Sequence, residues 1–318
     1  MSTAEIPGDL VYQPTVAILM CTLQGEKFLQ EQLASFNYQT HANWVLWVSD
    51  DGSTDSTIDI LKEYKSYNAP GKVHIIHKNG NNFVENFLSL VCNPEIVADY
   101  YAFSDQDDIW MDEKLEKALA KLLSFKKTIP SLYFSRTEYI NENNRKLGNS
   151  FPFTRLPCFE NALLQNIGGG NTMVFNQATK DLLSSFGYTT TPTSHDWWAY
   201  ILVTGCDGSI VFDPMPSVKY RQHAKNLVGS NRGLASKSKR ILKIFQGSYR
   251  SWLHQNNIMV KQFGSCLSAR NSVIFENYQK SLSFFFPVNV YYLIKSGVFR
   301  QTRKGTLVFF LAFILGLV

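Results

Sequence analysis

Apolar residues follow two alternating rhythms along the first two thirds of the chain. Short continuous runs, typical of buried strands, occupy residues 16–20, 44–50, 73–77 and 100–105. The segments that follow these runs carry apolar residues at helical spacing, over residues 28–36, 55–64, 82–91 and 115–123. Strands separated by helices of this size predict right-handed crossovers and a mostly parallel sheet covered on both faces.

Later segments continue the α/β pattern. Residues 131–140, 172–176 and 209–213 read as further strands, and residues 197–204 read as a helix. The tetrapeptide YRQH at 220–223 follows the last strand and a DPMPS turn. We expect it to fold back over the functional site, whose candidate residues are described next. No internal repeat or low-complexity segment is present in the sequence.

Acidic residues cluster where predicted strands end. Asp50 and Asp51 end the second strand, and Asp105 and Asp107 end the fourth. Ligands of open parallel sheets bind at the carboxyl ends of the strands. We therefore expect these carboxylates to share one rim of the sheet.

The segment FSDQDDIW at 103–110 carries the most suggestive chemistry. Asp105 and Asp107 stand one residue apart on extended chain and can address a single cation. Mg²⁺ and Mn²⁺ prefer oxygen ligands and take one or two carboxylates together with substrate phosphate. For Asp108 and Asp112, capping of the helix that follows is the favoured interpretation.

The segment SDDGSTD at 49–55 ends its strand in a similar way. Gly52 permits a tight turn, and Ser53 or Asp55 can cap the next helix. Asp50 and Asp51 are left for binding, since a carboxylate at this rim can accept the imide N–H of a pyrimidine or a ribose hydroxyl.

Charge divides the chain into two unlike parts. Residues 1–213 carry 15 Lys and Arg against 25 Asp and Glu, whereas residues 214–318 carry 16 against one. The basic part contains the apolar runs 281–293 and 306–318, which favours an anionic membrane surface over nucleic acid as its partner. Neither run reaches the roughly 20 apolar residues of a membrane span. The alternative is a soluble helical cap or a homo-oligomer interface.

Cysteine usage indicates the compartment. The five cysteines are odd in number, widely spaced and free of any CxxC pair, which favours a reduced cytosol. The first residues, MSTAEIPGDLVYQP, lack the basic and apolar pattern of a signal peptide. We expect the folded part to stay inside the cell.

Several motifs occur together in a familiar order. These are VAILMCTLQGEKFLQEQLASFNYQT, WVSDDGSTDST, FSDQDDIW, IGGGNTMVFN, SHDWWAYILV and YRQHAKNLVG. The chain resembles family 2 inverting glycosyltransferases of the GT-A fold, most closely the bacterial rhamnosyltransferases that build O-antigen and related surface polysaccharides. The resemblance covers about residues 14–230. It implies a GT-A domain at 1–230 and a basic, apolar, helical, membrane-associating region at 231–318.

The resemblance assigns roles around a nucleotide-sugar donor. Asp105 and Asp107 match the family's DxD-type pair, with Asp107 the direct ligand of a Mg²⁺ or Mn²⁺ ion on the donor diphosphate. Arg221 and His223 would meet that diphosphate or its metal. Asp51, with Asp50 and backbone groups near Thr22, would hold the nucleoside. Family members often carry an aromatic side chain at the position of Leu23, so base stacking is not implied there.

The resemblance also supplies a catalytic base. Asp196 begins an apolar helix, where Trp197 and Trp198 would desolvate its carboxylate, raise its pKa and make it a better proton acceptor. An N-cap role explains the same position from the residues alone. Glycines 168–170, Gly169 among them, would let the backbone approach the sugar or acceptor, although three glycines also suit a flexible turn.

The implied activity is inverting transfer of a sugar, with dTDP-L-rhamnose as donor and a polyprenyl-diphosphate-linked glycan as acceptor. The implied place is the cytoplasmic face of the bacterial inner membrane, to which the protein would bind peripherally. Two other classes remain open. A nucleotidyltransferase of sugar phosphates would want a metal diaspartate, but normally a Gly-rich basic loop after the first strand as well. A noncatalytic membrane-binding protein would leave the rim acids unexplained.

Overall fold

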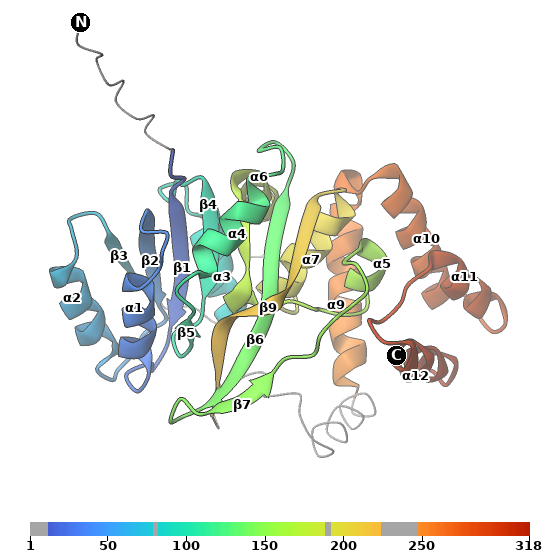
Figure 1. The fold of residues 1–318 in the computed structure, drawn as a ribbon. Coiled ribbons are helices and arrows are strands. Elements are labelled where there is room, and N and C mark those ends of the chain that lie inside the picture. The colour runs from blue at the N-terminus through green and yellow to red at the C-terminus, as the bar shows by residue number, and fades with distance from the viewer. Residues whose placement is uncertain (1–11, 79–81, 188–191, 224–246) are drawn as a thin grey trace, which may run out of the picture.

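The computed structural model describes residues 12–78, 82–187, 192–223 and 247–318. Its centre is a nine-stranded sheet in the order β3-β2-β1-β4-β8-β6-β9-β5, with β7 paired to β6 (Figure 1). The first part of the sheet is parallel, because β1 (Val16–Thr22) pairs with both β2 (Trp44–Asp50) and β4 (Tyr100–Ser104), and β2 pairs with β3 (Val73–His77). The α/β expectation is confirmed.

The helices of this half lie between the strands in sequence, as predicted. They are α1 (Leu29–Asn37), α2 (Thr57–Tyr67), α3 (Phe83–Cys92) and, after β4, α4 (Lys114–Leu122). Each buries an apolar stripe, which in α4 consists of Leu115, Ala118, Leu119 and Leu122. The periodicity of the sequence therefore located these helices to within a few residues.

The second half of the sheet adds antiparallel pairs. Strand β8 (Val174–Asn176) runs antiparallel to β4 and to β6 (Ser131–Asn141), while β6 runs parallel to the long strand β9 (Ser209–Gln222). The short strands β5 (Ile109–Trp110) and β7 (Lys146–Asn149) were not predicted. The predicted DPMPS turn is wrong, because β9 continues through it with a register shift opposite Ser135 and Arg136.

Apolar side chains pack on both faces of the sheet. One cluster joins alternate residues of β1 and β4, such as Leu19 and Phe103, to α3, α5 (Phe159–Ala162), α6 (Gln177–Ser184) and α7 (His195–Gly205). The other joins the opposite alternation, such as Ile18 and Ala102, to α1 and α4. The sheet is thus covered on both sides, as near-continuous apolar strands require.

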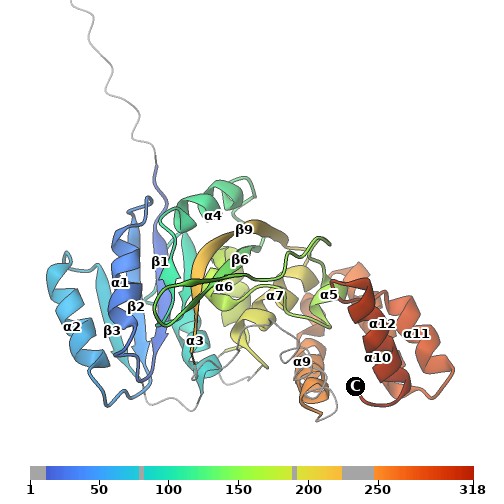
Figure 2. The same ribbon diagram turned by 60° about the horizontal axis from the view of Figure 1, so that its bottom comes forward.

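The described residues 247–318 form four helices, α9 (Ser248–Phe263), α10 (Ala269–Ser283), α11 (Val288–Ser296) and α12 (Arg303–Ile314). Helices α10, α11 and α12 lie at the end of the molecule opposite α2 and β3, beyond α5 and α7, and α9 lies beside α7 (Figures 1 and 2). No helix in the described part of the chain has the length and apolarity needed to cross a membrane.

The C-terminal helices share a core with the sheet domain. Val260 and Phe263 of α9 belong to the same apolar cluster as Trp198 of α7, and the rings of Phe263 and Trp198 lie 5.9 Å apart. Residues 231–246 of the predicted membrane-associating region lie outside the described residues. The domain division at residue 230 stays a prediction.

Candidate active site

The predicted rim forms where β2, β1 and β4 end side by side. Thr22, the last residue of β1, pairs in register with Asp50 of β2, and Met20 pairs with Ser104 of β4. Asp51 directly follows β2 and Asp105 directly follows β4, so the parallel register places both acids at one edge. The clustering of acids expected from the strand ends is therefore present.

The side chains of Asp50 and Thr22 form a hydrogen bond with each other, and Asp50 also accepts hydrogen bonds from the turn that follows β2. Both side chains are buried, and the Thr22 hydroxyl donates to Asp50 Oδ2 at 2.8 Å. The same carboxylate accepts hydrogen bonds from the Ser53 hydroxyl and from the amides of Gly52 and Ser53. Gly52 has the positive φ of 88° that the turn needs. Asp50 thus organises the loop, and the half-buried Asp51 lies further out on the rim.

Asp105 lies in a crowded negative environment. Burial, the carboxylate of Asp107 and the carboxylate of Asp196, in decreasing order of size, raise the pKa of Asp105 to about 7. A carboxyl group whose ionisation is opposed in this way gains most from a nearby cation. Asp196, distant in sequence, lies near this segment, because Gly170 donates to Asp196 Oδ2 and the next residue, Asn171, donates to Asp108 Oδ2.

Strand pairing brings His223 to Asp107. The short strand β5 follows the DQDD segment and runs antiparallel to β9, with Ile109 opposite Lys219. His223, just beyond β9, therefore lies beside Asp107, with its Nε2 atom 2.6 Å from Asp107 Oδ2. The ring of Phe28 packs against His223 at 5.3 Å. Two of the three predicted metal ligands, Asp107 and His223, are thus brought together, 116 residues apart in sequence.

Arg221 occupies a different environment from His223. Its side chain is fully buried, with Nε donating to the Asp107 carbonyl at 2.9 Å and Nη2 donating to Glu31 Oε2 at 3.0 Å. The guanidinium also lies 4.4 Å from the centre of the Phe28 ring. These contacts fix the backbone of the DQDD segment, so in this structure the Arg221 side chain positions Asp107 from behind.

The capping roles expected of Asp108 and Asp112 are wrong. Helix α4 has Glu113 at its N-cap and no side-chain capping bond. Asp108 is instead fully buried, where it accepts hydrogen bonds from the Asn171 side chain and the Arg221 backbone amide. Burial raises its pKa well above the ordinary value, with further contributions from Asp107 and Asp105. Asp108 therefore links two segments, the one that follows glycines 168–170 and strand β9, to the chain that follows β4.

The three glycines are packing residues more than turn residues. A Cβ atom on Gly168 would lie 2.6 Å from the Phe134 ring, and one on Gly170 would lie 2.5 Å from His195 Nε2. At Gly169, which is exposed on the rim, a Cβ atom would lie 2.7 Å from Asn171 Oδ1. None of the three has positive φ. Close approach, and not backbone freedom, requires glycine here.

Asp196 lies one position inside α7, whose N-cap is Ser194, so the N-cap interpretation is wrong. Its Oδ1 atom accepts hydrogen bonds from the Ser194 hydroxyl and the Trp197 amide, and its Oδ2 atom accepts one from the Gly170 amide at 3.1 Å. A carboxylate has about four acceptor positions, so Asp196 retains capacity to accept a proton.

The desolvation of Asp196 by Trp197 and Trp198 stays a prediction. Trp197 and Trp198 are both buried in the core, and the Trp197 indole N–H donates to the Ala162 carbonyl at 2.7 Å. Both tryptophans lie on the predicted apolar helix.

His195 is a site residue that sequence reasoning missed. It is 5% exposed and stacks on Phe87 at 4.0 Å, with Phe103 edge-on at 4.8 Å. Burial lowers its pKa to about 4, so the ring is neutral near pH 7, and neither ring nitrogen has a hydrogen-bond partner in the described structure. The only signal in the sequence was its position next to Asp196.

Gln106, the middle residue of the DQD motif, was also missed. Its side-chain amide accepts a hydrogen bond from the Leu23 amide and donates one to the Leu23 carbonyl, each 2.9 Å long. A Cβ atom on Gly25 would lie 2.4 Å from Gln106 Oε1. Gln106 thus joins the loop after β1 to the acidic segment through a pair of hydrogen bonds between its side chain and the backbone of Leu23.

Comparison with known proteins agrees with this arrangement. Residues 17–183 match the sequence model described as Glycosyl transferase family 2. The chain belongs to glycosyl transferase family 2. It is 30% identical over 243 residues to the dTDP-rhamnosyl transferase RfbG of Shigella flexneri, which covers 73% of this chain and 81% of that relative.

A second relative of this family 2 enzyme is the UDP-Glc:alpha-D-GlcNAc-diphosphoundecaprenol beta-1,3-glucosyltransferase WfgD of Escherichia coli. It is 29% identical over 173 residues, which cover 54% of this chain and 63% of WfgD.

Solved structures establish the fold of the family 2 chain as that of GT-A glycosyltransferases. The mannosyltransferase PcManGT of Pyrobaculum calidifontis, solved with GDP-Man and Mn²⁺, superposes with a TM-score of 0.51 at 14% identity, over 90% of this chain and 87% of that one. S. aureus TarS in complex with UDP superposes with a TM-score of 0.51 at 13% identity, over 89% and 88% of the two chains.

The rim of this family 2 enzyme suits a metal that is shared with a substrate. Among the described residues no group of three His, Cys, Asp or Glu side chains is arranged to hold a metal ion. Mg²⁺ or Mn²⁺ needs only one or two protein carboxylates when phosphate oxygens complete its shell. The raised pKa of Asp105 indicates negative charge that a cation would relieve. Asp105, Asp107 and His223 therefore fit a metal that arrives with a diphosphate.

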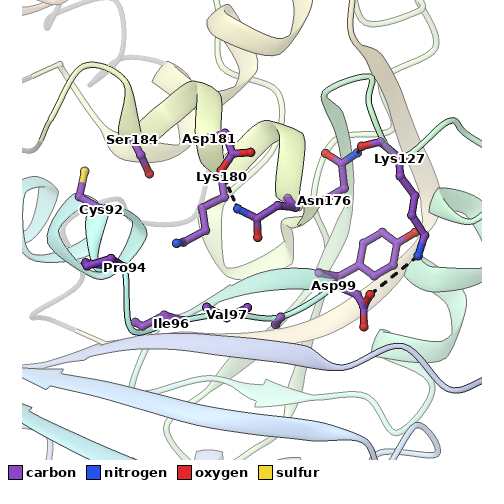
Figure 3. Close-up of a pocket in the computed structure, with 13 residues that line it drawn as sticks. Cys92, Pro94, Ile96, Val97, Asp99, Lys127, Asn176, Lys180, Asp181 and Ser184 are labelled. Atoms are coloured by element: carbon purple, nitrogen blue, oxygen red, sulfur yellow. Dashed lines mark hydrogen bonds and ion pairs between the residues drawn. The ribbon is translucent and has the colours of Figure 1, made fainter.

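A cavity of about 590 Å³ lies at the opposite end of β4, away from the rim (Figure 3). It is lined by Tyr100, the first residue of β4, and by Asn176, which pairs with Tyr100. Its lysines already have partners, since Lys127 is 3.8 Å from Asp99 and Lys180 donates to the Asn93 carbonyl at 3.2 Å. This cavity is separate from the glycosyltransferase rim.

Proposed function

We propose that this glycosyltransferase transfers L-rhamnose from dTDP-L-rhamnose, with inversion at the anomeric carbon, to a glycan carried on a polyprenyl diphosphate. The single observation that carries the proposal is the convergence of Asp105, Asp107 and Asp196 on one rim, where Asp196 and Asp107 both oppose the ionisation of Asp105. The identity of the donor is supported by the similarity to dTDP-rhamnosyl transferase RfbG.

Asp196 acts as the general base. Its Oδ2 atom faces the Gly170 amide and takes the proton of the acceptor hydroxyl, whose oxygen then attacks the anomeric carbon as the nucleoside diphosphate leaves. The Gly170 amide and the Ser194 hydroxyl hold the carboxylate in place. The exposed Gly169 leaves room for sugar or acceptor beside it.

The other rim residues bind the donor. Asp51 accepts from the nucleoside, and Asp50 and Thr22 fix the loop that presents it. Asp107, Asp105 and His223 would hold Mg²⁺ or Mn²⁺, and a bound ion would neutralise charge on the leaving diphosphate. Arg221 supports this set through the Asp107 carbonyl.

The C-terminal helices hold the enzyme on the anionic cytoplasmic face of the inner membrane. Several large apolar side chains of this region are strongly exposed, among them Phe285 at 89% and Phe286 at 72%. Contiguous exposed apolar residues on a basic region suit an interfacial membrane contact. A lipid-linked acceptor explains why a catalytic domain would carry such a surface.

A donor panel tests the proposal. The purified full chain should hydrolyse or transfer from dTDP-L-rhamnose in preference to UDP-glucose, UDP-N-acetylglucosamine and GDP-mannose, and chelation of divalent ions by EDTA should abolish turnover. Preference for a UDP or GDP sugar would overturn the assignment of the donor. Full turnover in EDTA would overturn the metal assignment and leave the family unaffected.

A further inference from the structure

A second cavity, of about 630 Å³, lies among the C-terminal helices, between α9, the end of α10, the start of α11 and the end of α12. Its volume falls in the range of roughly 300–1,000 Å³ that is usual for small-molecule sites. Most of its wall is apolar and comes from side chains far apart in sequence: Leu253, Leu282, Phe284, Phe309, Phe313 and Val318.

The charged side chains that line this cavity are cationic. Arg250 and His254 on α9 line it and are exposed at its edge. No side chain among its described lining residues is acidic. Helix α9 begins here at Ser248, with Gly247 as its N-cap, so its N-terminal end adds positive potential. An apolar interior with a positive edge suits a hydrocarbon chain that carries an anionic group.

The cavity is continuous with the exposed aromatic surface. Phe284 lines the cavity and begins the exposed run Phe284, Phe285 and Phe286 between α10 and α11. The exposed rings and the apolar wall therefore meet at Phe284. This continuity favours an amphiphile over a water-soluble ligand.

Helix α9 both lines the cavity and contacts the segment that carries Asp196, the proposed catalytic base. On another part of its surface it contacts Thr193, whose hydroxyl donates to the Trp252 carbonyl at 3.1 Å and whose amide is 3.5 Å from Asn256 Oδ1. Thr193 lies three residues before Asp196 in the sequence. One helix therefore forms a wall of the cavity and supports the segment that carries the proposed base.

We infer that this cavity holds the prenyl units nearest the diphosphate of a polyprenyl diphosphate, with Arg250 and His254 beside the phosphate groups. The inference rests on the proposed function, because it assigns a place to the carrier of the proposed acceptor. We commit to the prenyl diphosphate because the cavity combines a single apolar interior with a cationic edge on the helix that reaches the Asp196 segment.

Binding of geranylgeranyl diphosphate to the full chain tests the inference without donor or acceptor sugar. Wild-type protein should bind this probe saturably, and geranylgeraniol, which lacks the charge, should bind at least tenfold more weakly. Leu282→Asp, in the apolar wall, and Arg250→Glu, at the edge, should each weaken binding at least tenfold. Both positions are exposed enough to accept the change without loss of fold.

Matched controls lie on the same helices outside the cavity. Val273→Asp on α10 and Lys261→Glu on α9 should stay within twofold of wild type. Equal losses in control and cavity variants, or absence of saturable binding, would overturn the inference. So would displacement of the probe by dihexanoyl phosphatidylglycerol as effective as that by unlabelled geranylgeranyl diphosphate, because the site would then be one for phospholipid.

Donor hydrolysis separates this inference from the proposed function. The cavity variants should hydrolyse the nucleotide sugar within twofold of wild type, since none of the changed residues touches the rim. Normal donor hydrolysis with no prenyl diphosphate binding would overturn the cavity assignment alone. Prenyl diphosphate binding with a different preferred donor would overturn the donor assignment alone.

Discussion

The sheet domain and the C-terminal helices use charge in opposite ways. At the rim, acids are drawn together and partly buried, and Asp108 is removed from solvent altogether. In the part of the sequence after position 213, 16 Lys and Arg stand against the single acid Glu276. Apolar side chains such as Phe285 lie exposed there.

The difference indicates two kinds of partner. Concentrated negative charge at a strand edge is electrostatically costly unless a cation or proton neutralises it, so the rim is suited to a small ligand that brings a metal. Spread positive charge with exposed apolar groups is suited to an extended anionic surface. Each of the following changes removes one of these properties and leaves the other in place.

Asp196→Asn should have the largest effect. General base catalysis contributes about 10²–10⁴ in rate, and we expect turnover to fall by about 10³ while donor affinity changes less than threefold. Single-turnover kinetics and calorimetric donor titration measure the two quantities. Asp181→Asn, at the cavity remote from the rim, is the matched control and should keep full activity. A loss of only a few fold at Asp196 would make it a structural residue of α7.

Asp107→Asn should have the next largest effect. The amide keeps an oxygen that can accept from His223 but lacks the charge that attracts a divalent ion. We expect turnover to fall by about 10² and the stimulation of donor binding by Mn²⁺ to disappear. Calorimetry with and without Mn²⁺ measures this. Mn²⁺ stimulation that survives in the variant would contradict the role of Asp107.

Substitution of the exposed apolar side chains tests the other region. The double variant Phe285→Ser, Ile294→Ser should lower affinity for phosphatidylglycerol vesicles by at least about tenfold, since burial of one such side chain contributes roughly 1.5–3 kcal/mol. Donor hydrolysis should be unchanged. The control pair Val97→Ser, Leu156→Ser removes equally exposed apolar groups from the sheet domain and should leave vesicle sedimentation unaltered.

This surface change is a sharper test than deletion of residues 281–318. Phe309 and Phe313 of α12 belong to the main core cluster, so the deletion would expose the core as well as remove the membrane contact.

The last prediction concerns Asp105→Asn and the smallest of the expected effects, a change in the free energy of unfolding. The pKa of Asp105 is about 7 in the fold and ordinarily about 3.9 in an unfolded chain, so the folded protein binds more protons between these pH values. Wild-type stability from this group therefore falls as pH rises from about 4 to 7 and is constant above. The variant has no such dependence.

We expect the variant to gain about 1–2 kcal/mol over wild type by pH 8 and nothing at pH 4 in the absence of metal. The difference between the two urea unfolding curves across pH is the quantity to measure. His195 has the opposite effect, because its lowered pKa of about 4 makes stability rise with pH up to the ordinary histidine value. Both proteins contain His195, so its contribution cancels when the stability of wild type is subtracted from that of the variant. A difference that does not vary with pH would contradict the environment assigned to Asp105.

Local sequence pattern determined the first half of the fold and the position of the rim. Strands β1 to β4 and the helices α1 to α4 follow from apolar periodicity, because each buries residues that are close neighbours in sequence. Parallel strands end at one edge, so the acids after β2 and β4 had to meet there. The antiparallel strands of the second half were less predictable, because short strands such as β5 carry little periodic signal.

The sequence by itself determined which acids reach the rim, but only the tertiary structure decided what each of them does. Asp105 and Asp108 are three residues apart and chemically identical, yet one lies half-buried on the rim and the other is buried against Asn171 and the backbone of Arg221. The pairing of β5 with β9, the contact of His223 with Asp107 and the cavity beside α9 also join segments far apart in the chain. Such contacts depend on long-range packing and strand register, which a local pattern of residues does not encode.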